Sequence, residues 1–177
     1  MQTLKACLAA LLLAGCVSPS SQAPTEPPRI VRASEAAVVD YADGLALSLT
    51  PPGSTAYSQL RLVERAGYRT PLHVHHETDE TFFVLQGELT VFTGGQVHTL
   101  GPGDYAFISR GTPHAQGNQT QSETIVLLSM VPGDFAGFFA ARAELVADTP
   151  PGHPQYVERM MALGDRFDIE VIGPTPF

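Results

Sequence analysis

The chain has 177 residues, of which 44% are hydrophobic and 16% are charged, and its formal net charge is −8. This length suits one folded domain, and the acidic excess, with Lys5 as the only lysine, argues against a surface that binds nucleic acid or anionic membranes. The 16 glycines and 15 prolines favour short strands and tight turns, and two cysteines are too few for a disulfide-based scaffold.

The first 15 residues have the pattern of a signal peptide. Residues 1–5 are polar with one positive charge, and residues 6–14 are almost wholly apolar, far short of the ~20 residues that span a bilayer. Residues 13–16 read Leu-Ala-Gly-Cys and resemble the lipobox of bacterial lipoproteins. That resemblance implies lipidation of Cys16 and a lipid-anchored protein of the bacterial cell envelope, facing the periplasm or the exterior. A plain secretory signal is the alternative.

The segment 16–29 is polar and rich in serine and proline. Such a segment buries little apolar surface and is expected to act as a semi-extended tether. The folded domain is therefore predicted over residues 30–177, and contact with the membrane is expected only through the N-terminal lipid.

Alternating apolar and polar residues predict strands through the first part of this domain. Leu45, Leu47 and Leu49 alternate with smaller residues, and Leu60 and Leu62 share one face of a strand. Further strands are predicted over 81–85, 88–92, 96–100, 105–109 and 124–130. Glycine- and proline-rich turns separate them. Many short strands at this spacing indicate a sandwich or barrel, predicted over about 30–131.

The pattern becomes helical in the segment 132–177. Asp134 is predicted to cap a helix that runs from Phe135 to about Val146, and a second helix is expected from about Pro154 to Gly164. A short last strand is predicted over 167–171. The apolar stripes of both helices indicate packing, so the fold class is all-β with a C-terminal helix pair.

Two histidines and a glutamate lie close together in the sequence. His73 and His75 are two residues apart, so their rings leave the same face of a strand. Glu80 follows, and His114 is a further candidate from a later strand. Imidazole and carboxylate groups suit divalent transition metals, although surface strands also carry histidine pairs.

These residues stand at the spacing of the two cupin motifs. The first motif is matched by Gly67, His73, His75, Glu80 and Gly87, and the second by Gly103, Gly111, His114 and Asn118. Ser109 stands where the second motif usually has proline. The chain thus resembles the cupins, which implies a double-stranded β-helix (jelly-roll) barrel. It also implies one divalent transition metal (Fe, Mn, Ni, Co, Cu or Zn) held by His73, His75, Glu80 and His114.

The other histidines and nearby carboxylates are weaker candidates. His76 is expected to point away from the metal face, and His98 and His153 are expected at the surface or in structural positions. Glu77 and Asp79 are expected either to be solvated or to orient the ligand histidines.

Four residues are candidates for the wall of a cavity, namely Phe82, Val84, Phe107 and Gln116. Phe82 and Val84 share one face of a strand with Glu80, and Gln116 has the same parity as His114. A packed core predicts the same aromatic and aliphatic residues, so both interpretations stay open.

The layout of the folded part resembles bacterial single-domain cupins described as quercetin-dioxygenase-like. This resemblance implies a mononuclear dioxygenase acting on a flavonol-like or other enolic small molecule, with Glu80 as the catalytic residue that takes the substrate's hydroxyl proton. The alternatives are a non-oxygenase metal enzyme of the isomerase or decarboxylase type, and a non-catalytic envelope protein that binds a metal or ligand. A homodimer formed through the sheets is also implied.

Overall fold

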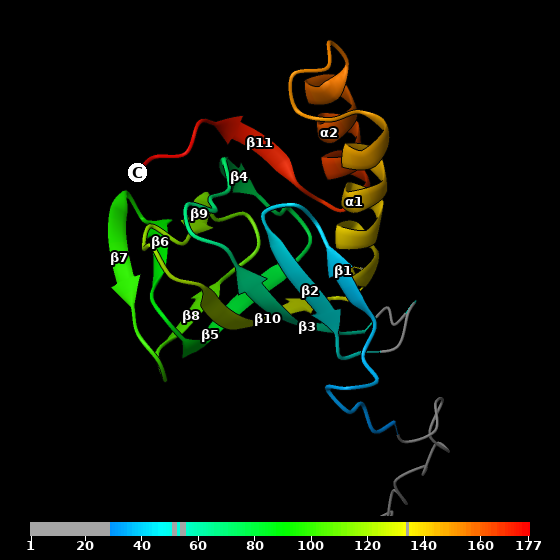
Figure 1. Cartoon of the computed structure of the whole chain (residues 1–177). Coiled ribbons are helices and arrows are strands. Elements are labelled where there is room, and N and C mark those ends of the chain that lie inside the picture. The colour runs from blue at the N-terminus through cyan, green and yellow to red at the C-terminus, as the bar shows by residue number, and fades with distance from the viewer. Residues whose placement is uncertain (1–28, 51–52, 54–55, 134) are drawn as a thin grey trace, which may run out of the picture. The chain divides into compact units, whose positions relative to one another are not determined.

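Two antiparallel sheets form most of the folded unit, Val31–Phe177, in the computed structural model (Figure 1). The structure describes residues 29–50, 53, 56–133 and 135–177. The predicted signal peptide, the lipidation site Cys16, nearly all of the tether and the helix cap Asp134 lie outside the described residues.

The larger sheet has six strands in the order β1-β2-β3-β10-β5-β8. Their bounds are β1 Val38–Asp40, β2 Gly44–Ser48, β3 Ser58–Glu64, β10 Thr124–Val131, β5 Asp79–Gln86 and β8 Tyr105–Ile108. The second sheet has the order β11-β4-β9-β6-β7. Its strands are β11 Glu170–Gly173, β4 Leu72–Val74, β9 His114–Gly117, β6 Leu89–Thr93 and β7 Gln96–Leu100. The strands predicted from the alternation therefore form, and the fold is mostly β with two C-terminal helices, as predicted.

The core lies on the inner face of the larger sheet. Alternate side chains of β3, β5 and β10 are at most 1% exposed, and each buried aliphatic or aromatic side chain stabilises the fold by roughly 1.5–3 kcal/mol. These side chains are Leu60, Leu62, Phe82, Val84, Val126, Leu128 and Met130. In β2 it is Ala46 that joins this core, because it pairs in register with Leu62, whereas Leu45 is only half-buried.

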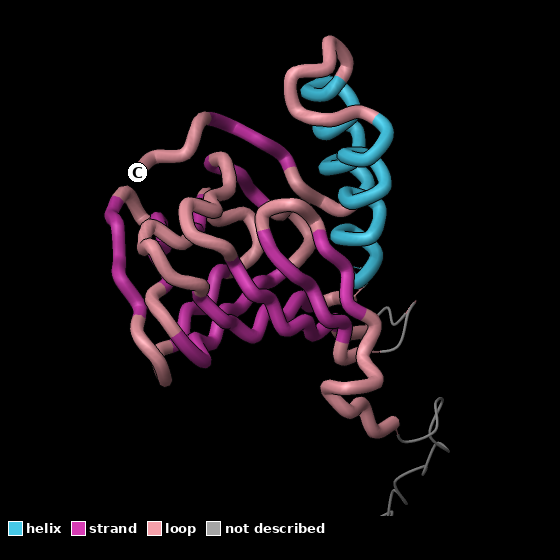
Figure 2. Tube along the Cα trace, viewed as in Figure 1, coloured by secondary structure: helices cyan, strands magenta, loops and turns pink. Residues whose placement is uncertain are grey.

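Two helices follow β10 and pack side by side (Figure 2). A short 3₁₀ turn, Phe135–Gly137, leads into α1 (Phe138–Asp148), and α2 covers Tyr156–Arg166. The first α-helix thus begins three residues later than predicted. None of the helices in the described part of the chain is both long and apolar enough to cross a membrane.

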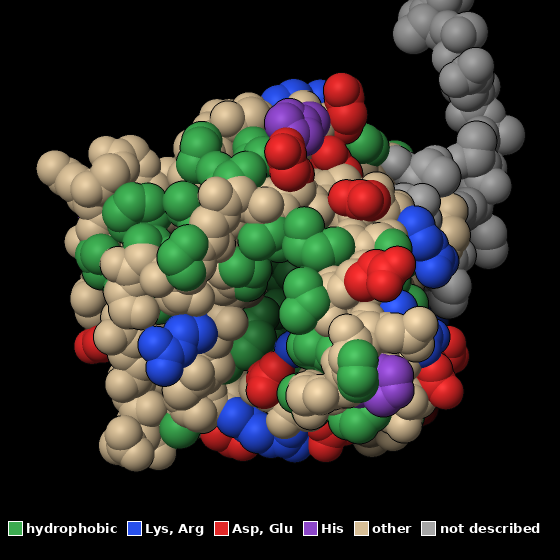
Figure 3. Space-filling model, turned by 90° about the horizontal axis from the view of Figure 1, so that it is seen from above, with side chains coloured by type: hydrophobic (Ala, Val, Ile, Leu, Met, Phe, Trp, Pro, Cys, Tyr) green, Lys and Arg blue, Asp and Glu red, His purple; other side chains and the backbone are tan. Residues whose placement is uncertain are grey.

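An aromatic cluster joins the helical segment to the barrel. The ring of Phe135 packs against the rings of Phe138, Phe139 and Phe167, with centroids 5.0, 6.0 and 6.2 Å away. Phe135 and Phe139 belong to the buried core, so this cluster serves packing, as the helical stripes predict. On the face seen from above, Figure 3 shows a hollow where hydrophobic side chains gather, with acidic and basic side chains around it.

Candidate metal centre

Four side chains from different strands converge inside the barrel. One potential ligand atom from each of His73, His75, Glu80 and His114 lies within 4.8 Å of those of the other three. His73 on β4 pairs in register with His114 on β9, His75 directly follows β4, and Glu80 comes from β5 in the other sheet. All four side chains are buried, with exposed fractions of 0–5%. The structure thus brings the four predicted ligands together.

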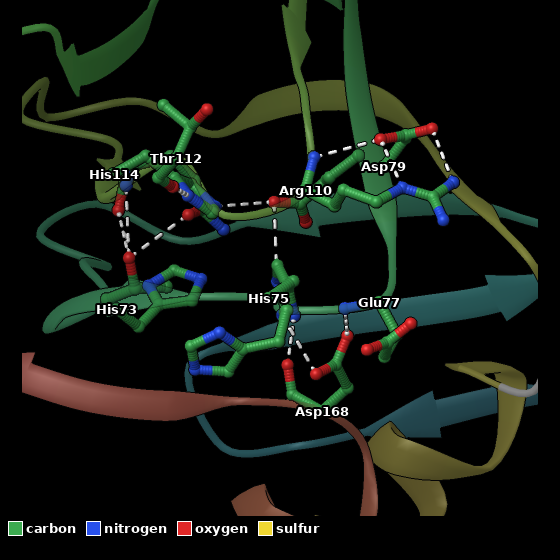
Figure 4. A network of polar contacts seen from close by, with 12 residues as sticks. His73, His75, Glu77, Asp79, Arg110, Thr112, His114 and Asp168 are labelled. Atoms are coloured by element: carbon green, nitrogen blue, oxygen red, sulfur yellow. Dashed lines mark hydrogen bonds and ion pairs between the residues drawn. The ribbon is translucent and has the colours of Figure 1, made fainter.

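Each histidine of this cluster is held through Nδ1 by a main-chain carbonyl. The acceptors are Pro71 for His73 at 2.9 Å, Asp168 for His75 at 2.6 Å and Thr112 for His114 at 2.9 Å (Figure 4). An imidazole that donates from Nδ1 keeps the lone pair of Nε2 free for a metal. The hydrogen bonds therefore fix both the tautomer and the direction of each ring.

The carboxylate of Glu80 is the charged member of the cluster. Its Oε2 lies 2.7 Å from Nε2 of His114 and 3.6 Å from Nε2 of His75. Burial alone would raise the pKa of Glu80, but the effect of the two histidines is larger and opposite. The pKa therefore lies below its usual value, and the carboxylate stays ionised. Burial, together with the nearby His114, lowers the pKa of His73 to about 4 and keeps its ring neutral.

One atom of the cluster lacks a partner that a divalent metal could supply. Nε2 of His75 is buried and has no hydrogen-bond partner among the described residues. An unpartnered buried polar atom is costly, and a metal ion would satisfy it. Neutral imidazoles with one carboxylate match the preferences of first-row transition metals, and four protein ligands leave room for further ligands on an octahedral ion.

Glu77 and Asp79, the carboxylates between His75 and Glu80 in the sequence, do not orient the ligand histidines. Asp79 accepts hydrogen bonds from the guanidinium and the main-chain N–H of Arg110. His76 points away from the cluster, and its Nε2 lies 2.6 Å from a carboxylate oxygen of Glu170. The side chain of Glu77 is exposed, as are those of the bystander histidines His98 and His153.

The predicted cavity wall is found only in part. Phe82 and Val84 are fully buried and belong to the packed core. Gln116 is also buried, and its side-chain oxygen accepts a hydrogen bond from the hydroxyl of Thr70 at 3.0 Å. The prediction for Phe107 is wrong, because its side chain is 58% exposed on the outer face of β8.

The register of β8 explains this error. Phe107 pairs with Thr81, and Ile108 pairs with Glu80, so Ile108 takes the inward position. The alternation within 105–109 did not reveal which of the two parities faces the interior.

Sequence reasoning missed the main-chain groups that hold the histidines. For His73 and His114 the acceptor is the carbonyl two residues earlier, and for His75 it is the carbonyl of Asp168, 93 residues later. A carbonyl belongs to every residue, so it leaves no signal in the sequence. Asp168 stands out only in the structure, where it is a non-glycine residue with positive φ, which is uncommon.

Comparison with known proteins places this site in a recognised domain. Residues 61–131 match the family model described as "Cupin domain". A segment of 60 residues, 34% of the chain, is 42% identical to quercetin 2,3-dioxygenase from Bacillus subtilis (strain 168), and a segment of 73 residues, 41% of the chain, is 38% identical to an uncharacterized protein from Aquifex aeolicus (strain VF5). The matched segments span only 18% and 59% of those two proteins.

Solved structures show the same architecture. KdgF from Halomonas sp. superposes with a TM-score of 0.56 at 17% identity, over 62% of this chain and 97% of that one. An RmlC-like cupin from Shewanella frigidimarina NCIMB 400 gives a TM-score of 0.55 at 15% identity, over 62% and 95%. At these identities the likeness concerns the fold alone. The chain therefore has the cupin double-stranded β-helix fold, with its cupin domain in residues 61–131.

Proposed function

We propose that the protein is a mononuclear metal-dependent dioxygenase acting on a flavonol-like or other enolic small molecule. The observation that carries the proposal is the buried cluster of His73, His75, Glu80 and His114, in which a main-chain carbonyl fixes every imidazole. The partial match to a quercetin 2,3-dioxygenase supports the oxygenase chemistry, although it covers 18% of that enzyme.

The roles of the four residues follow from their chemistry. His73, His75 and His114 would hold the ion through Nε2, with Glu80 as the fourth ligand. A bound divalent metal supplies Lewis acidity toward the substrate and a template for its reaction with dioxygen. Glu80 is ionised and can accept the hydroxyl proton of an enolic substrate that reaches it.

A small hollow lies beside the cluster, although none of the four ligands lines it. A hollow of about 120 Å³ adjoins the site, since its wall includes Asp168, which binds His75, and Phe135, whose ring packs 6.0 Å from that of His75. Small-molecule sites commonly have volumes of about 300–1,000 Å³. A flavonol would therefore fit this hollow only if Phe135 and Phe167, which line it, move aside.

Oxygen uptake tests the proposal. Protein loaded in turn with Fe, Mn, Ni, Co and Cu is mixed with a panel of flavonols and smaller enols, and dioxygen consumption is recorded. We expect uptake with at least one metal, loss of uptake in Glu80→Gln and normal uptake in the control His98→Ala. Absence of uptake with every metal would remove the dioxygenase assignment.

The burial of the four ligands favours a second candidate function. Ligands that are 0–5% exposed beside a hollow of about 120 Å³ suit a small substrate or a metal held without turnover. A non-oxygenase enzyme of the isomerase or decarboxylase type, or an envelope metal- or ligand-binding protein, would bind metal at the same residues. Metal binding without oxygen uptake would support this second candidate.

We also propose that the protein is anchored to the bacterial envelope by lipid on Cys16, on the strength of the Leu-Ala-Gly-Cys run at residues 13–16. The protein is expected in the membrane fraction, and Cys16→Ala is expected to release it. Retention of Cys16→Ala in the membrane fraction would contradict the anchor.

A homodimer through the larger sheet is a further proposal. The outer face of this sheet exposes three aromatic side chains on adjacent strands, Phe83, Tyr105 and Phe107, with exposed fractions of 38–58%. Exposed aromatic patches of this kind are typical of protein interfaces. Sedimentation at several concentrations is expected to show a dimer that Phe107→Ser weakens.

A further inference from the structure

Asp168 connects the C-terminal segment to the metal centre through two different groups. It lies between α2 and β11 in the left-handed conformation, with φ of 57°. Its main-chain oxygen accepts the hydrogen bond from Nδ1 of His75 at 2.6 Å. Its carboxylate oxygens accept the main-chain N–H groups of His76 and Glu77, both at 2.9 Å (Figure 4).

These contacts hold one short stretch of chain from two sides. The carboxylate binds the main chain immediately after His75, and the carbonyl binds the ring of His75 itself. The left-handed conformation of Asp168 accompanies both contacts, and aspartate, asparagine and glycine tolerate it best. The carboxylate therefore anchors the carbonyl that orients the ring.

His75 differs in this respect from the other two histidines. His73 and His114 donate to carbonyls two residues earlier in their own segments, so local backbone conformation sets their direction. His75 depends on a residue 93 positions away. Its main-chain oxygen also accepts the N–H of Gly111 at 2.6 Å, which fixes the backbone but not the ring.

We propose that Asp168 is a positioning residue for the metal ligand His75, with its carboxylate securing the segment whose carbonyl fixes the imidazole. The C-terminal segment is thereby part of the metal centre, although it contributes no ligand. This inference rests on the metal binding proposed above. Groups that orient a ligand in this way typically change metal affinity by about 10–100-fold when they are removed.

Titration with Co²⁺ alone tests the inference in the full folded chain. Asp168→Gly keeps the tolerance of positive φ and removes only the carboxylate, so backbone strain does not confuse the result. We expect it to bind Co²⁺ at least about 10-fold more weakly than the wild type. Asp168→Asn retains one acceptor oxygen and should lose less affinity. Asp165→Asn, on the exposed surface of α2, is the matched control and should bind as the wild type does.

A second readout separates positioning from a general loss of structure. In the Co²⁺-loaded protein, the Nδ1 proton of each bound histidine gives a hyperfine-shifted NMR signal that exchanges with solvent. In Asp168→Gly we expect one of these signals to exchange faster while the others stay unchanged. A purely structural defect would alter all of them or none.

The outcomes distinguish this inference from the function on which it rests. If the wild type binds no Co²⁺, the proposed metal centre fails, and the role of Asp168 fails with it. If the wild type binds Co²⁺ and Asp168→Gly binds it equally well with unchanged histidine signals, only the role of Asp168 is overturned. Should Asp168→Gly not fold, wild-type affinity in Asp168→Asn would overturn the inference instead.

Discussion

Glu80 and Glu64 are both buried glutamates of the six-stranded sheet, and both lie on strands that pair with β10. Glu80 stands opposite Met130, and Glu64 stands opposite Thr124. Histidines surround the carboxylate of Glu80 and keep it ionised. Neither carboxylate oxygen of Glu64 has a hydrogen-bond partner among the described residues, and burial, together with the charge of Glu80, raises the pKa of Glu64 to about 8.

The difference shows how partners decide what a buried carboxyl group can do. Both residues are at most 3% exposed, so burial alone does not separate them. Glu80 keeps its charge because the imidazole rings of His75 and His114 lie beside its carboxylate, and that charge is what a metal site requires. Glu64 holds a proton at neutral pH, so it offers no anionic ligand and costs stability as the pH rises.

The largest effect is expected at the partnered carboxylate. His114→Ala removes both a ligand and the nearest partner of Glu80, and Glu80→Gln removes the charge. Each should weaken the binding of a divalent metal by more than ~100-fold, the upper end of what loss of an orienting partner costs. Titration with Co²⁺ measures this, with His98→Ala as the control. Wild-type affinity in His114→Ala would contradict the assignment of the ligands.

A smaller effect, on stability, is expected at the unpartnered carboxyl group. The pKa of Glu64 is raised in the folded state from its usual value of 4.5 to about 8, so its contribution to stability is complete below pH 4.5 and is lost as the pH rises toward 8. Glu64→Gln abolishes this loss. The variant should match the wild type near pH 4 and exceed it by ~3 kcal/mol at pH 7.

Denaturant unfolding at several pH values measures this difference. A stability gap between Glu64→Gln and the wild type that stays constant from pH 4 to pH 8 would show that Glu64 is ionised in the folded protein. The comparison between the two glutamates would then lose its basis.

The smallest effect is expected of Glu64 on metal binding. Glu64 makes no hydrogen bond to any of the four ligands among the described residues, and it holds its proton at neutral pH, so Glu64→Gln should leave the Co²⁺ affinity within about threefold of the wild type. A loss comparable to that of Glu80→Gln would mean that the two carboxyl groups act together.

Two features could be predicted from the sequence: the face of β5 that points into the interior, and the identity of the candidate metal ligands. Glu80, Phe82 and Val84 share the buried face because side chains alternate along a strand, and the motif spacing located His114. The position of Phe107 could not be predicted, because the pairing of β8 with β5 fixes its side of the sheet. The protonated state of Glu64 could not be predicted either, because it results from burial without a hydrogen-bond partner among the described residues, and only the fold shows this.

The hydrogen bonds that Asp168 makes to residues 75–77 show a different limit of prediction from the sequence. The role of Asp168 depends on two segments that the pairing of β11 with β4 brings together, where Glu170 lies opposite Val74. The sequence predicted a last strand over 167–171, whereas β11 begins at Glu170, and Asp168 adopts a left-handed turn before it. Local patterns identify elements, but contacts between distant turns follow from the complete fold.

The X-ray absorption spectrum of the Co²⁺-loaded protein tests the central claim most directly, because it reports the ligands of the ion itself. We predict one ion per chain with the scattering pattern of three imidazoles and further oxygen ligands, and loss of one imidazole in His114→Ala. A spectrum with oxygen ligands alone, or one that His114→Ala leaves unchanged, would contradict a metal centre built from His73, His75, Glu80 and His114.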